Sequence, residues 1–414
     1  MVNDAPPAPA VDGARLWRRL MDMAQVGPTA NGGSNRQALS DDDAAGRALL
    51  LGWAIEAGCS AETDAIGNLW IRRPGTDPEA PSVLIGSHLD TQPTGGRFDG
   101  VYGVLGGFEV IEWLNDHRVT TRHPIDLVVW TNEEGSRFQR SMMGSAVWAG
   151  ALELEAARAL ADVDGVTVAD ELDRLGWAGP RPAGPSRHAA AFELHIEQGP
   201  ILEAEELEIG VVTGVQGLRW FTLELGGFPA HAGPTPMAGR RDPARAIAAV
   251  VTRVYEAVEA HGEWARATFA QFQSTPISPN TIPETLGCTL DIRHPDGEVL
   301  DRMEADVRSV VGEECDRLGV EAELIRRNDS PPVLFDSAVV DAVEASVVTL
   351  GLPYRRMISG AGHDACYVAA HCPTAMIFVP CEGGLSHNEA ERITEAQATN
   401  GASVLLGAVL ATAN

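Results

Sequence analysis

Acidic residues and histidines follow the ends of short apolar runs in this sequence of 414 residues. The run VLIGSH ends in His88, with Asp90 two residues further on, and the run IDLVVWT is followed by Glu133 and Glu134. Two adjacent carboxylates repel each other unless a cation neutralises them. Asp90 is placed to hold the His88 imidazole in one tautomer, as an acid beside a metal-bound histidine does. Each pair taken alone is also compatible with an ordinary polar turn.

Three further segments carry residues of the same types. Asp99 stands among glycines in RFDGVYG, where an N-cap is the plainer interpretation; His195 follows the apolar run AAFEL; and His387 follows the run TAMIFV and a Gly-Gly turn. Five unrelated caps and turns explain the joint pattern poorly. Nitrogen and oxygen ligands without a thiolate suit Zn²⁺ or Mn²⁺, and a carboxylate that bridges two ions is typical of hydrolytic centres. The set therefore predicts a two-metal hydrolytic centre.

The segments around these residues indicate an α/β domain. Apolar runs at 68–73, 83–88 and 125–131 are separated by a helical stretch at 103–114, and Ser40 is placed to cap a further helix. Strands with near-continuous apolar runs that alternate with helices indicate a mostly parallel, buried sheet. The carboxyl ends of such strands are where α/β sheets bind their ligands.

The pattern changes near Gly214. Strands are expected at 219–227 and 285–294, and long amphipathic helices at 243–260 and 298–319. The order β-α-β-β-α-β is that of a small α+β sandwich with a largely antiparallel sheet.

The α/β pattern returns after this segment with two helices and a strand, at 336–350, 394–413 and 374–379. The sequence therefore predicts an α/β body formed by residues 1–213 and 333–414, interrupted by an inserted α+β domain at 214–332. The exposed strand and long helix of the inserted domain are suited to pairing with a second copy around a two-fold axis. We expect it to serve as a lid and dimerisation domain.

Net charge and lysine content exclude several functions. The chain has 31 basic and 58 acidic residues and a formal net charge of −27, which argues against nucleic acids and anionic membranes as partners. It contains no lysine, so all 31 basic residues are arginine. A Schiff-base lysine, a P-loop, a Ser–Lys hydrolase and a carbamylated-lysine metal bridge are therefore excluded.

Cysteine usage and hydropathy predict a soluble, cytoplasmic protein. The six cysteines are scattered without a C-x-x-C pair, which fits a reducing compartment better than a zinc ribbon or a disulfide framework. The N-terminal segment MVNDAPPAPAVDG lacks the basic and apolar regions of a signal peptide, and we expect a short flexible tail. The longest apolar stretches, such as 402–413, are shorter than the roughly 20 residues of a membrane span.

Five motifs, in this order and with an inserted domain, resemble those of the M20-type metallopeptidase-fold amidases: SHLDT, FDGVYG, NEEGSRF, HIEQGP and SHNEAE. More narrowly, they resemble the hydantoinase/carbamoylase subfamily, which contains N-carbamoyl-L-amino-acid hydrolases, allantoate amidohydrolases and β-ureidopropionases. The resemblance extends from about residue 14 to the C-terminus, and NEEGSRF and HIEQGP are its most specific parts. It implies a mostly parallel-sheet, metallopeptidase-like catalytic domain.

The resemblance also implies a ligand set. One metal ion would be held by His88, Asp99 and His195. The other would be held by Asp99, Glu134 and His387, with Asp99 as the bridge. Peptidases of this fold commonly have a carboxylate at the position of His195 and a second polar residue after the bridging aspartate. Here Gly100 follows Asp99, and both departures match the carbamoylase branch rather than a general dipeptidase.

By the same resemblance, Glu133 would be the general base that takes a proton from the metal-bound water and delivers it to the leaving nitrogen. His231, in FPAHAGP, would donate to the oxyanion of the tetrahedral intermediate, although a helix-capping loop explains that motif equally well on its own. The family's substrate-binding positions are matched by Gln198, Asn280, Arg293 and Gly362. The planar guanidinium of an arginine suits a carboxylate, which it binds with two hydrogen bonds. His363 and Asp364 are interpreted as supporting structure.

These expectations combine into a homodimeric amidohydrolase with two divalent ions per chain. It would hydrolyse the ureido C–N bond of an N-carbamoyl-L-amino acid to amino acid, CO₂ and ammonia. Allantoate amidohydrolase and β-ureidopropionase activities use the same machinery and stay open as alternatives, with an M20-type dipeptidase less favoured. A non-catalytic metal-binding or assembly protein would have no use for Glu133. His231 is expected to reach into the partner's metal cleft.

Overall fold

The computed structural model describes residues 9–414 and divides the chain into two compact units. Within the described residues, the first unit comprises 9–214 and Leu334–Asn414, and the second comprises Val215–Val333. Most of the expected N-terminal tail lies outside the described residues. At its end, Asp12 caps helix α1, Gly13–Met23, which the sequence analysis does not predict. No helix within residues 9–414 is long and apolar enough to cross a membrane.

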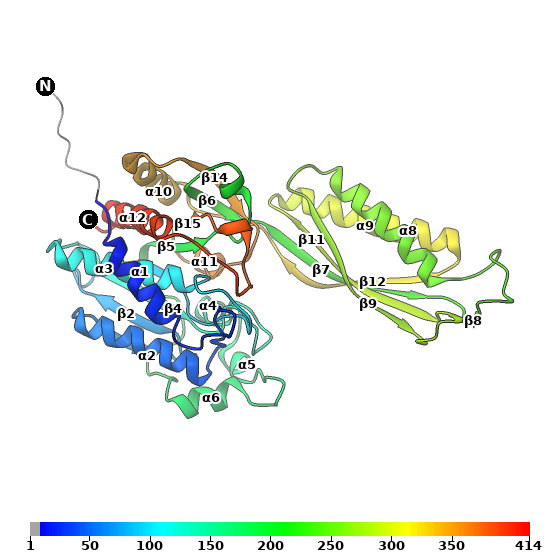
Figure 1. Ribbon diagram of the computed structural model, residues 1–414, viewed down its shortest axis with the longest axis horizontal. Helices are drawn as coiled ribbons and strands as arrows, with labels where there is room; N and C mark the ends of the chain where they lie inside the picture. Colours follow the sequence, from blue (N-terminus) through cyan, green and yellow to red (C-terminus); the bar gives the residue numbers. More distant parts are fainter. Residues whose placement is uncertain (1–8) are drawn as a thin grey trace, which may run out of the picture. The chain divides into compact units, whose positions relative to one another are not determined.

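The first unit is built on a mixed sheet (Figure 1). Within the described chain, its nine strands are β1 (Ser60–Thr63), β2 (Leu69–Arg73), β3 (Ser82–His88), β4 (Ile125–Trp130), β5 (His188–Ile196), β6 (Ile209–Val215), β13 (Val333–Leu334), β14 (Tyr354–Ser359) and β15 (Thr374–Val379). Eight of them follow the order β1-β2-β4-β3-β5-β15-β6-β13, and β14 pairs with β6. The central strands β4, β3, β5 and β15 are parallel, whereas the pairs β1–β2, β2–β4 and β15–β6 are antiparallel.

The first unit also contains helices, several of which contact the central strands of this sheet. The longer ones are α2 (Asp41–Glu56), α3 (Val101–Asp116), α10 (Ser337–Leu350) and α12 (Glu395–Thr412). The shorter ones are α4 (Met143–Trp148), α5 (Leu154–Arg158), α6 (Val168–Leu175), α7 (Ile201–Ala204) and α11 (Ala365–Val368). Ser40 caps α2 as predicted, since its side chain accepts a hydrogen bond from the Asp43 N–H. Helix α3 approaches the sheet closely, because a Cβ on Gly103 would lie 2.2 Å from the Leu194 carbonyl oxygen. The alternation of parallel strands and packed helices confirms the predicted α/β fold class.

The second unit has a four-stranded antiparallel sheet in the order β12-β7-β11-β9, with all its strands among the described residues. The strands are β7 (Gly217–Gly226), β9 (Arg266–Thr275), β11 (Thr285–His294) and β12 (Glu321–Ser330). A small separate sheet pairs β8 (Ala230–His231) with β10 (Thr281–Ile282). Helices α8 (Pro243–Glu259) and α9 (Gly297–Leu318) pack against the larger sheet.

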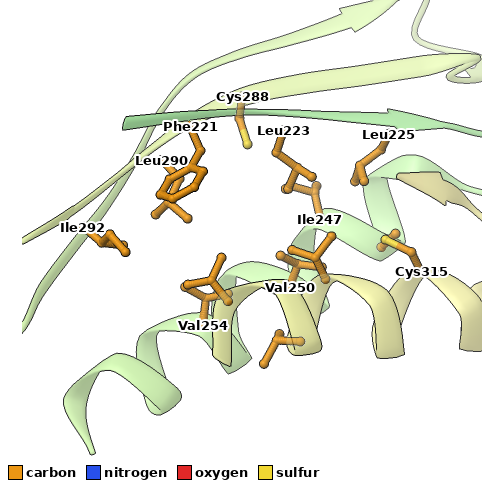
Figure 2. Close-up of a cluster of buried hydrophobic side chains, with 14 of the residues drawn as sticks. Phe221, Leu223, Leu225, Ile247, Val250, Val254, Cys288, Leu290, Ile292 and Cys315 are labelled. Atoms are coloured by element: carbon orange, nitrogen blue, oxygen red, sulfur yellow. The ribbon is translucent and has the colours of Figure 1, made fainter. Parts of the chain in front are cut away.

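The core of the second unit lies between its sheet and these two helices (Figure 2). Leu223 on β7 and Leu290 on β11 point towards Val250 and Val254 on α8, and all four side chains are buried. Alternate positions of β7 and β11 point away from this core, which is the period-two pattern of a sheet covered on one face. The unit therefore has its own hydrophobic core, as an independent domain requires.

Candidate functional site

Asp99 lies at the centre of the site, and its two carboxylate oxygens face different partners. Oδ1 is 3.2 Å from His195 Nε2 and 3.6 Å from His88 Nε2. Oδ2 is 3.7 Å from His387 Nε2, which is in turn 3.2 Å from Glu134 Oε2. The structure thus brings together all five predicted ligands, in the two groups that the resemblance implies.

The parallel strands explain this convergence. His88 is the last residue of β3, His195 is the penultimate residue of β5, and Glu134 follows β4. His387 follows β15 through a short 3₁₀ turn, Glu382–Gly384. Because β4, β3, β5 and β15 are adjacent and parallel, their carboxyl ends meet at one edge of the sheet. His195 lies inside its strand rather than after it, which is a small correction to the sequence analysis.

Backbone contacts orient the two buried histidines. His88 Nδ1 is 2.9 Å from the Asp90 carbonyl oxygen, and His195 Nδ1 is 3.0 Å from the Ile196 carbonyl oxygen. A carbonyl can only accept, so each Nδ1 carries a proton and each Nε2 is directed towards Asp99. Gly100 lies against His88: its φ is +66°, and a Cβ there would lie 2.3 Å from the imidazole ring. The glycine after Asp99 is therefore required by packing.

The expected role of the Asp90 carboxylate is wrong. It is the Asp90 backbone carbonyl that contacts His88, whereas the carboxylate accepts from the backbone N–H groups of Glu133 and Glu134, each at 3.2 Å. Burial raises the pKa of Asp90 to about 6. Asp90 therefore holds the turn that carries both glutamates, because the chain after β3 directs its side chain towards the neighbouring end of β4.

The charges of the site are unusual for a protein interior. Burial raises the pKa of Glu133 well above its ordinary value, and the nearby acids Asp364 and Glu134 add to this effect. Burial also favours protonation of Asp99, but His195 and His88 outweigh it and hold the Asp99 pKa well below its usual range. The hydrogen bond that His387 donates to the Glu134 carboxylate raises the pKa of His387 to about 9. Closely packed carboxylates and imidazoles that face one another in this way are the arrangement that a bound cation stabilises.

Two carboxylates that the sequence analysis missed support the ligands. Glu391 Oε1 accepts from the N–H groups of Phe98 and Asp99, at 2.8 and 3.1 Å, and Oε2 lies 3.3 Å from the Ser386 hydroxyl. Glu193 accepts from the Ser87 hydroxyl and the Ala365 N–H. A charged residue inside the apolar strand AAFELHI is a signal that could have revealed Glu193, since a buried acid needs partners.

His363 is buried beside His195, with ring centroids 4.6 Å apart. Its Nε2 lies 3.1 Å from the Ser359 hydroxyl, and burial lowers its pKa well below the ordinary value. Glu193, His195 and His363 also lie close enough to hold an ion. Both oxygens of Glu193 already accept hydrogen bonds, so we assign Glu193 and His363 to the support of His195.

Gln198 and Gly362, two predicted substrate contacts, also belong to the first unit. Gln198 Nε2 donates to Asp99 Oδ2 at 2.7 Å, while its buried Oε1 has no hydrogen-bond partner among the described residues. Gly362 packs against Met142, because a Cβ at this glycine would lie 3.2 Å from Met142 Cε. Gln198 thus contacts the Asp99 carboxylate directly, and its Oε1 is left as an additional hydrogen-bond acceptor.

His231 and Asn280 lie together in the second unit. The residue after His231 donates its N–H to the Asn280 carbonyl oxygen at 2.8 Å, and His231 pairs with Thr281 between β8 and β10. His231 is exposed, and its Nδ1 accepts from the Gly233 N–H at 3.1 Å.

Arg293 lies at the opposite end of the second unit's sheet. It stands near the end of β11, opposite Leu218, whereas the start of β11, at Thr285, is opposite Gly226, just before β8. The interval is 293 − 285 = 8 residues, or roughly 26 Å along an extended strand. Arg293 pairs with Asp291, with Nη2 2.8 Å from Oδ2.

Comparison with known proteins agrees with this geometry. The model of peptidase family M20/M25/M40 matches residues 84–411. N-carbamoyl-L-amino-acid amidohydrolase of Rhizobium meliloti is 47% identical over 403 residues, which cover 97% of each protein. Allantoate amidohydrolase of Escherichia coli (strain K12) is 34% identical, over 84% of this chain and 85% of that protein.

A crystal structure of an amidase of the hydantoinase/carbamoylase family from Burkholderia multivorans is 50% identical to this chain. It aligns with a TM-score of 0.95, over 98% of this chain and 99% of that chain. The match to the family model spans most of the chain, and the relatives are similar over nearly their whole lengths. This chain is therefore an amidohydrolase that belongs to peptidase family M20/M25/M40, in its hydantoinase/carbamoylase branch.

Proposed function

We propose that this amidohydrolase hydrolyses the ureido group of N-carbamoyl-L-amino acids. The observation that carries the proposal is the Asp99 carboxylate between two groups of ligands, with the Glu133 carboxylate 3.5 Å from His88 and outside either group. A site that only stores metal needs the metal ligands but does not need an additional carboxylate such as that of Glu133. The name of the Rhizobium meliloti relative, 47% identical, supports the choice of substrate class.

The donor set fits two divalent cations, Zn²⁺ or Mn²⁺. His88 and His195 face one oxygen of Asp99, and His387 and Glu134 face the other, so one carboxylate serves both groups. Imidazole and carboxylate ligands without a thiolate suit these ions. When bound, the ions would polarise the scissile carbonyl group and promote the ionisation of water.

The residues of the chain would supply the proton transfers. Glu133 takes a proton from the attacking water and delivers it to the leaving nitrogen as the bond between that nitrogen and the carbonyl carbon breaks. The remaining carbamate decomposes, so the final products are the amino acid, CO₂ and ammonia. Asp90 fixes the Glu133 backbone through its hydrogen bond to the N–H, and Gln198 holds the bridging carboxylate.

Residues of the second unit would complete the site. His231 is assigned as a donor to the oxyanion of the tetrahedral intermediate, with Asn280 beside it, and Arg293 as the group that binds the substrate carboxylate. The interval of roughly 26 Å between the two ends of β11 far exceeds the length of an N-carbamoyl amino acid. One substrate therefore cannot contact His231 and Arg293 of the same chain, which supports a homodimer whose sites combine residues of both chains.

Apolar side chains around His231 support such an assembly. Phe228, Met237 and Ile277 are 58%, 63% and 96% exposed, and all three lie near β8 and β10 in the sequence. Large apolar side chains that are exposed on paired or neighbouring segments are typical of a surface that another protein covers. We assign that surface to a second copy of this chain. Cytoplasmic location stays a prediction based on the cysteine pattern.

Allantoate and N-carbamoyl-β-alanine are the alternative substrates, because each combines a ureido group with a carboxylate; an allantoate amidohydrolase is also among the relatives. The test is ammonia release by protein reconstituted with Zn²⁺ or Mn²⁺. The panel contains N-carbamoyl-L-amino acids, their D-enantiomers as matched controls, N-carbamoyl-β-alanine, allantoate and dipeptides. We expect the highest kcat/KM for an N-carbamoyl-L-amino acid and none for its D-enantiomer. A higher value for allantoate or a dipeptide would contradict the proposal.

A further inference from the structure

Asp364 is a buried acid that the proposed chemistry does not use. It directly precedes helix α11, and its side chain is fully buried. One oxygen, Oδ1, is hydrogen bonded to the hydroxyl of Ser145 on α4. The other, Oδ2, has no hydrogen-bond partner among the described residues. An ionised carboxylate in this position would be a buried charge with half of its acceptors unused, which is costly.

The hydrogen bonds of Ser145 indicate how this cost is avoided. Its hydroxyl also lies 3.2 Å from the Met142 carbonyl oxygen. A serine has one hydroxyl proton, and both a carbonyl and an ionised carboxylate can only accept, so Ser145 cannot serve both. If Asp364 carries a proton, it donates to Ser145, and Ser145 donates to Met142. A protonated Asp364 is thus the state in which each short contact has one donor and one acceptor.

The charges around Asp364 favour the same state. Glu193 on β5 and Asp90 after β3 disfavour a further negative charge there, whereas His88 at the end of β3 favours one. Burial and Glu193 together raise the pKa of Asp364 well above its ordinary value. Glu133 follows β4, and the charge of Asp364 raises the pKa of Glu133 by the same electrostatic repulsion.

The contacts continue from Met142 to Glu133. The Met142 N–H donates to the Glu133 carbonyl oxygen at 2.7 Å, and the next residue donates to the Asn132 carbonyl oxygen at 3.2 Å. Asn132 and Met142 have φ values of +57° and +53°, in the left-handed region that non-glycine residues avoid. Such conformations cost about 1–3 kcal/mol each and persist only where surrounding contacts impose them. The turn that carries Glu133 is held by Asp90 on one side, and through Met142 it is also linked to Ser145.

We propose that Asp364 is protonated and, through Ser145 and Met142, positions Glu133 for proton transfer. This inference rests on the proposed role of Glu133 as general base. Asp364 is then a positioning residue, and its removal should lower kcat without removing metal or weakening substrate binding.

The test is a double-mutant cycle on the reconstituted enzyme, with whichever substrate of the panel is hydrolysed fastest. Asp364→Ala and Ser145→Ala should each lower kcat on the order of 10²-fold, with KM and metal content unchanged, since a displaced catalytic group costs about that much. The double variant should be no slower than Asp364→Ala alone, because both changes break one chain of contacts. Asp364→Asn should retain most of kcat, since its amide N–H donates to Ser145 as the acid does.

Ser346→Ala is the matched control. Ser346 is also buried and its hydroxyl donates to a backbone carbonyl, that of Val404 at 2.9 Å, but it lies on α10. Its loss should lower the melting temperature and leave kcat unchanged. Losses of kcat that multiply in the double variant, or an unchanged kcat in Asp364→Ala, would overturn the inference.

Asp364→Asn keeps the inference testable should Asp364→Ala fail to fold. The infrared difference between the wild-type protein and Asp364→Asn at neutral pH should contain the carbonyl stretch of one protonated carboxylic acid. Absence of that band would show that Asp364 is ionised and would refute the inference. A failure of the proposed function can be told apart from a failure of this inference. If Glu133 is not the general base, Glu133→Gln will retain its activity, whereas the double-mutant cycle will still measure the coupling between Ser145 and Asp364.

Discussion

Asp99 shows what residue types and spacing can predict at the scale of single residues. It and the other four predicted ligands could be singled out because each is a histidine or an acid that lies at or follows a strand end or, in the case of Asp99, precedes helix α3, and these segments meet in space. The role of Asp90 could not be predicted, because the path of the chain after β3 decides whether its carbonyl or its carboxylate contacts His88. Glu391 is the last residue of the motif SHNEAE, but the motif alone does not show that it accepts from the backbone before α3.

Arg293→Lys should lower kcat/KM strongly with an N-carbamoyl-L-amino acid, since an ammonium group cannot form the two parallel hydrogen bonds of a guanidinium. The loss of kcat/KM should be smaller with the corresponding N-carbamoyl-L-amino acid amide, in which an amide replaces the carboxylate. Arg266→Lys is the control, because Arg266 is opposite Arg293 on the neighbouring strand and is exposed. An unchanged kcat/KM with the acidic substrate would remove Arg293 from the site.

Glu391→Ala should destabilise the metal-free protein, since the N–H groups of Phe98 and Asp99 lose their common acceptor. A buried donor left without a partner costs about 1–3 kcal/mol. Glu391→Gln keeps one oxygen in place and should lose much less stability, as should the control Glu389→Ala, because the hydrogen bond between Glu389 and Asn31 is exposed. Urea unfolding measures all three, and equal stability of Glu391→Ala and the wild type would contradict this role.

At the scale of elements, long and strongly patterned segments were predictable and short ones were not. Strands β11 and β15 have the predicted bounds, and the four longest predicted helices are present within a few residues. Helices α4, α5 and α6 were missed, because five to eight residues carry too little periodicity to be recognised. They pack around Phe138, Met143 and Leu172 in a small core of their own, which only the folded chain reveals.

His188, the first residue of β5, should make stability depend on pH. It is buried between the hydroxyls of Ser82 and Ser186, at 2.8 and 2.9 Å, and burial lowers its pKa from 6.5 to about 4. Above pH 6.5 the imidazole is neutral in both the folded and the unfolded protein. As the pH falls from 6.5 towards 4, the unfolded chain takes up the proton first, so this residue destabilises the fold by about 2 kcal/mol at pH 5.

The measurement is the free energy of urea unfolding of the metal-free protein at pH 7 and pH 5. His188→Gln cannot take up a proton, so its loss of stability between the two pH values should be smaller than that of the wild type by about 2 kcal/mol. Equal losses in both proteins would show that His188 is protonated in the folded state.

At the scale of the whole molecule, the second unit carries residues that one substrate cannot reach together. His231 and Arg293 stand at opposite ends of the same sheet, a separation that follows from strand register and that sequence motifs do not reveal. In the homodimer that we propose, an active site built from two chains would remove the difficulty, because each chain would contribute one end of its sheet to each of two sites.

Co-expression of Glu133→Ala and His231→Ala chains tests this arrangement. Random assembly makes half of the dimers mixed, and in each mixed dimer one site has both an intact Glu133 and the partner chain's intact histidine. About a quarter of the wild-type activity should therefore return, although each variant alone is inactive. If His231 served its own chain, every site would lack one essential group, and the mixture would stay inactive.

The central claim is that Glu134 binds metal while its neighbour Glu133 transfers protons. The most direct test measures metal content and ammonia release on the same preparations of Glu133→Gln and Glu134→Gln. Glu133→Gln should keep the metal content of the wild type and lose about 10²–10⁴-fold in kcat, the usual contribution of a general base. Glu134→Gln should lose metal and activity together. Loss of metal in Glu133→Gln, or wild-type activity in that variant, would contradict the account.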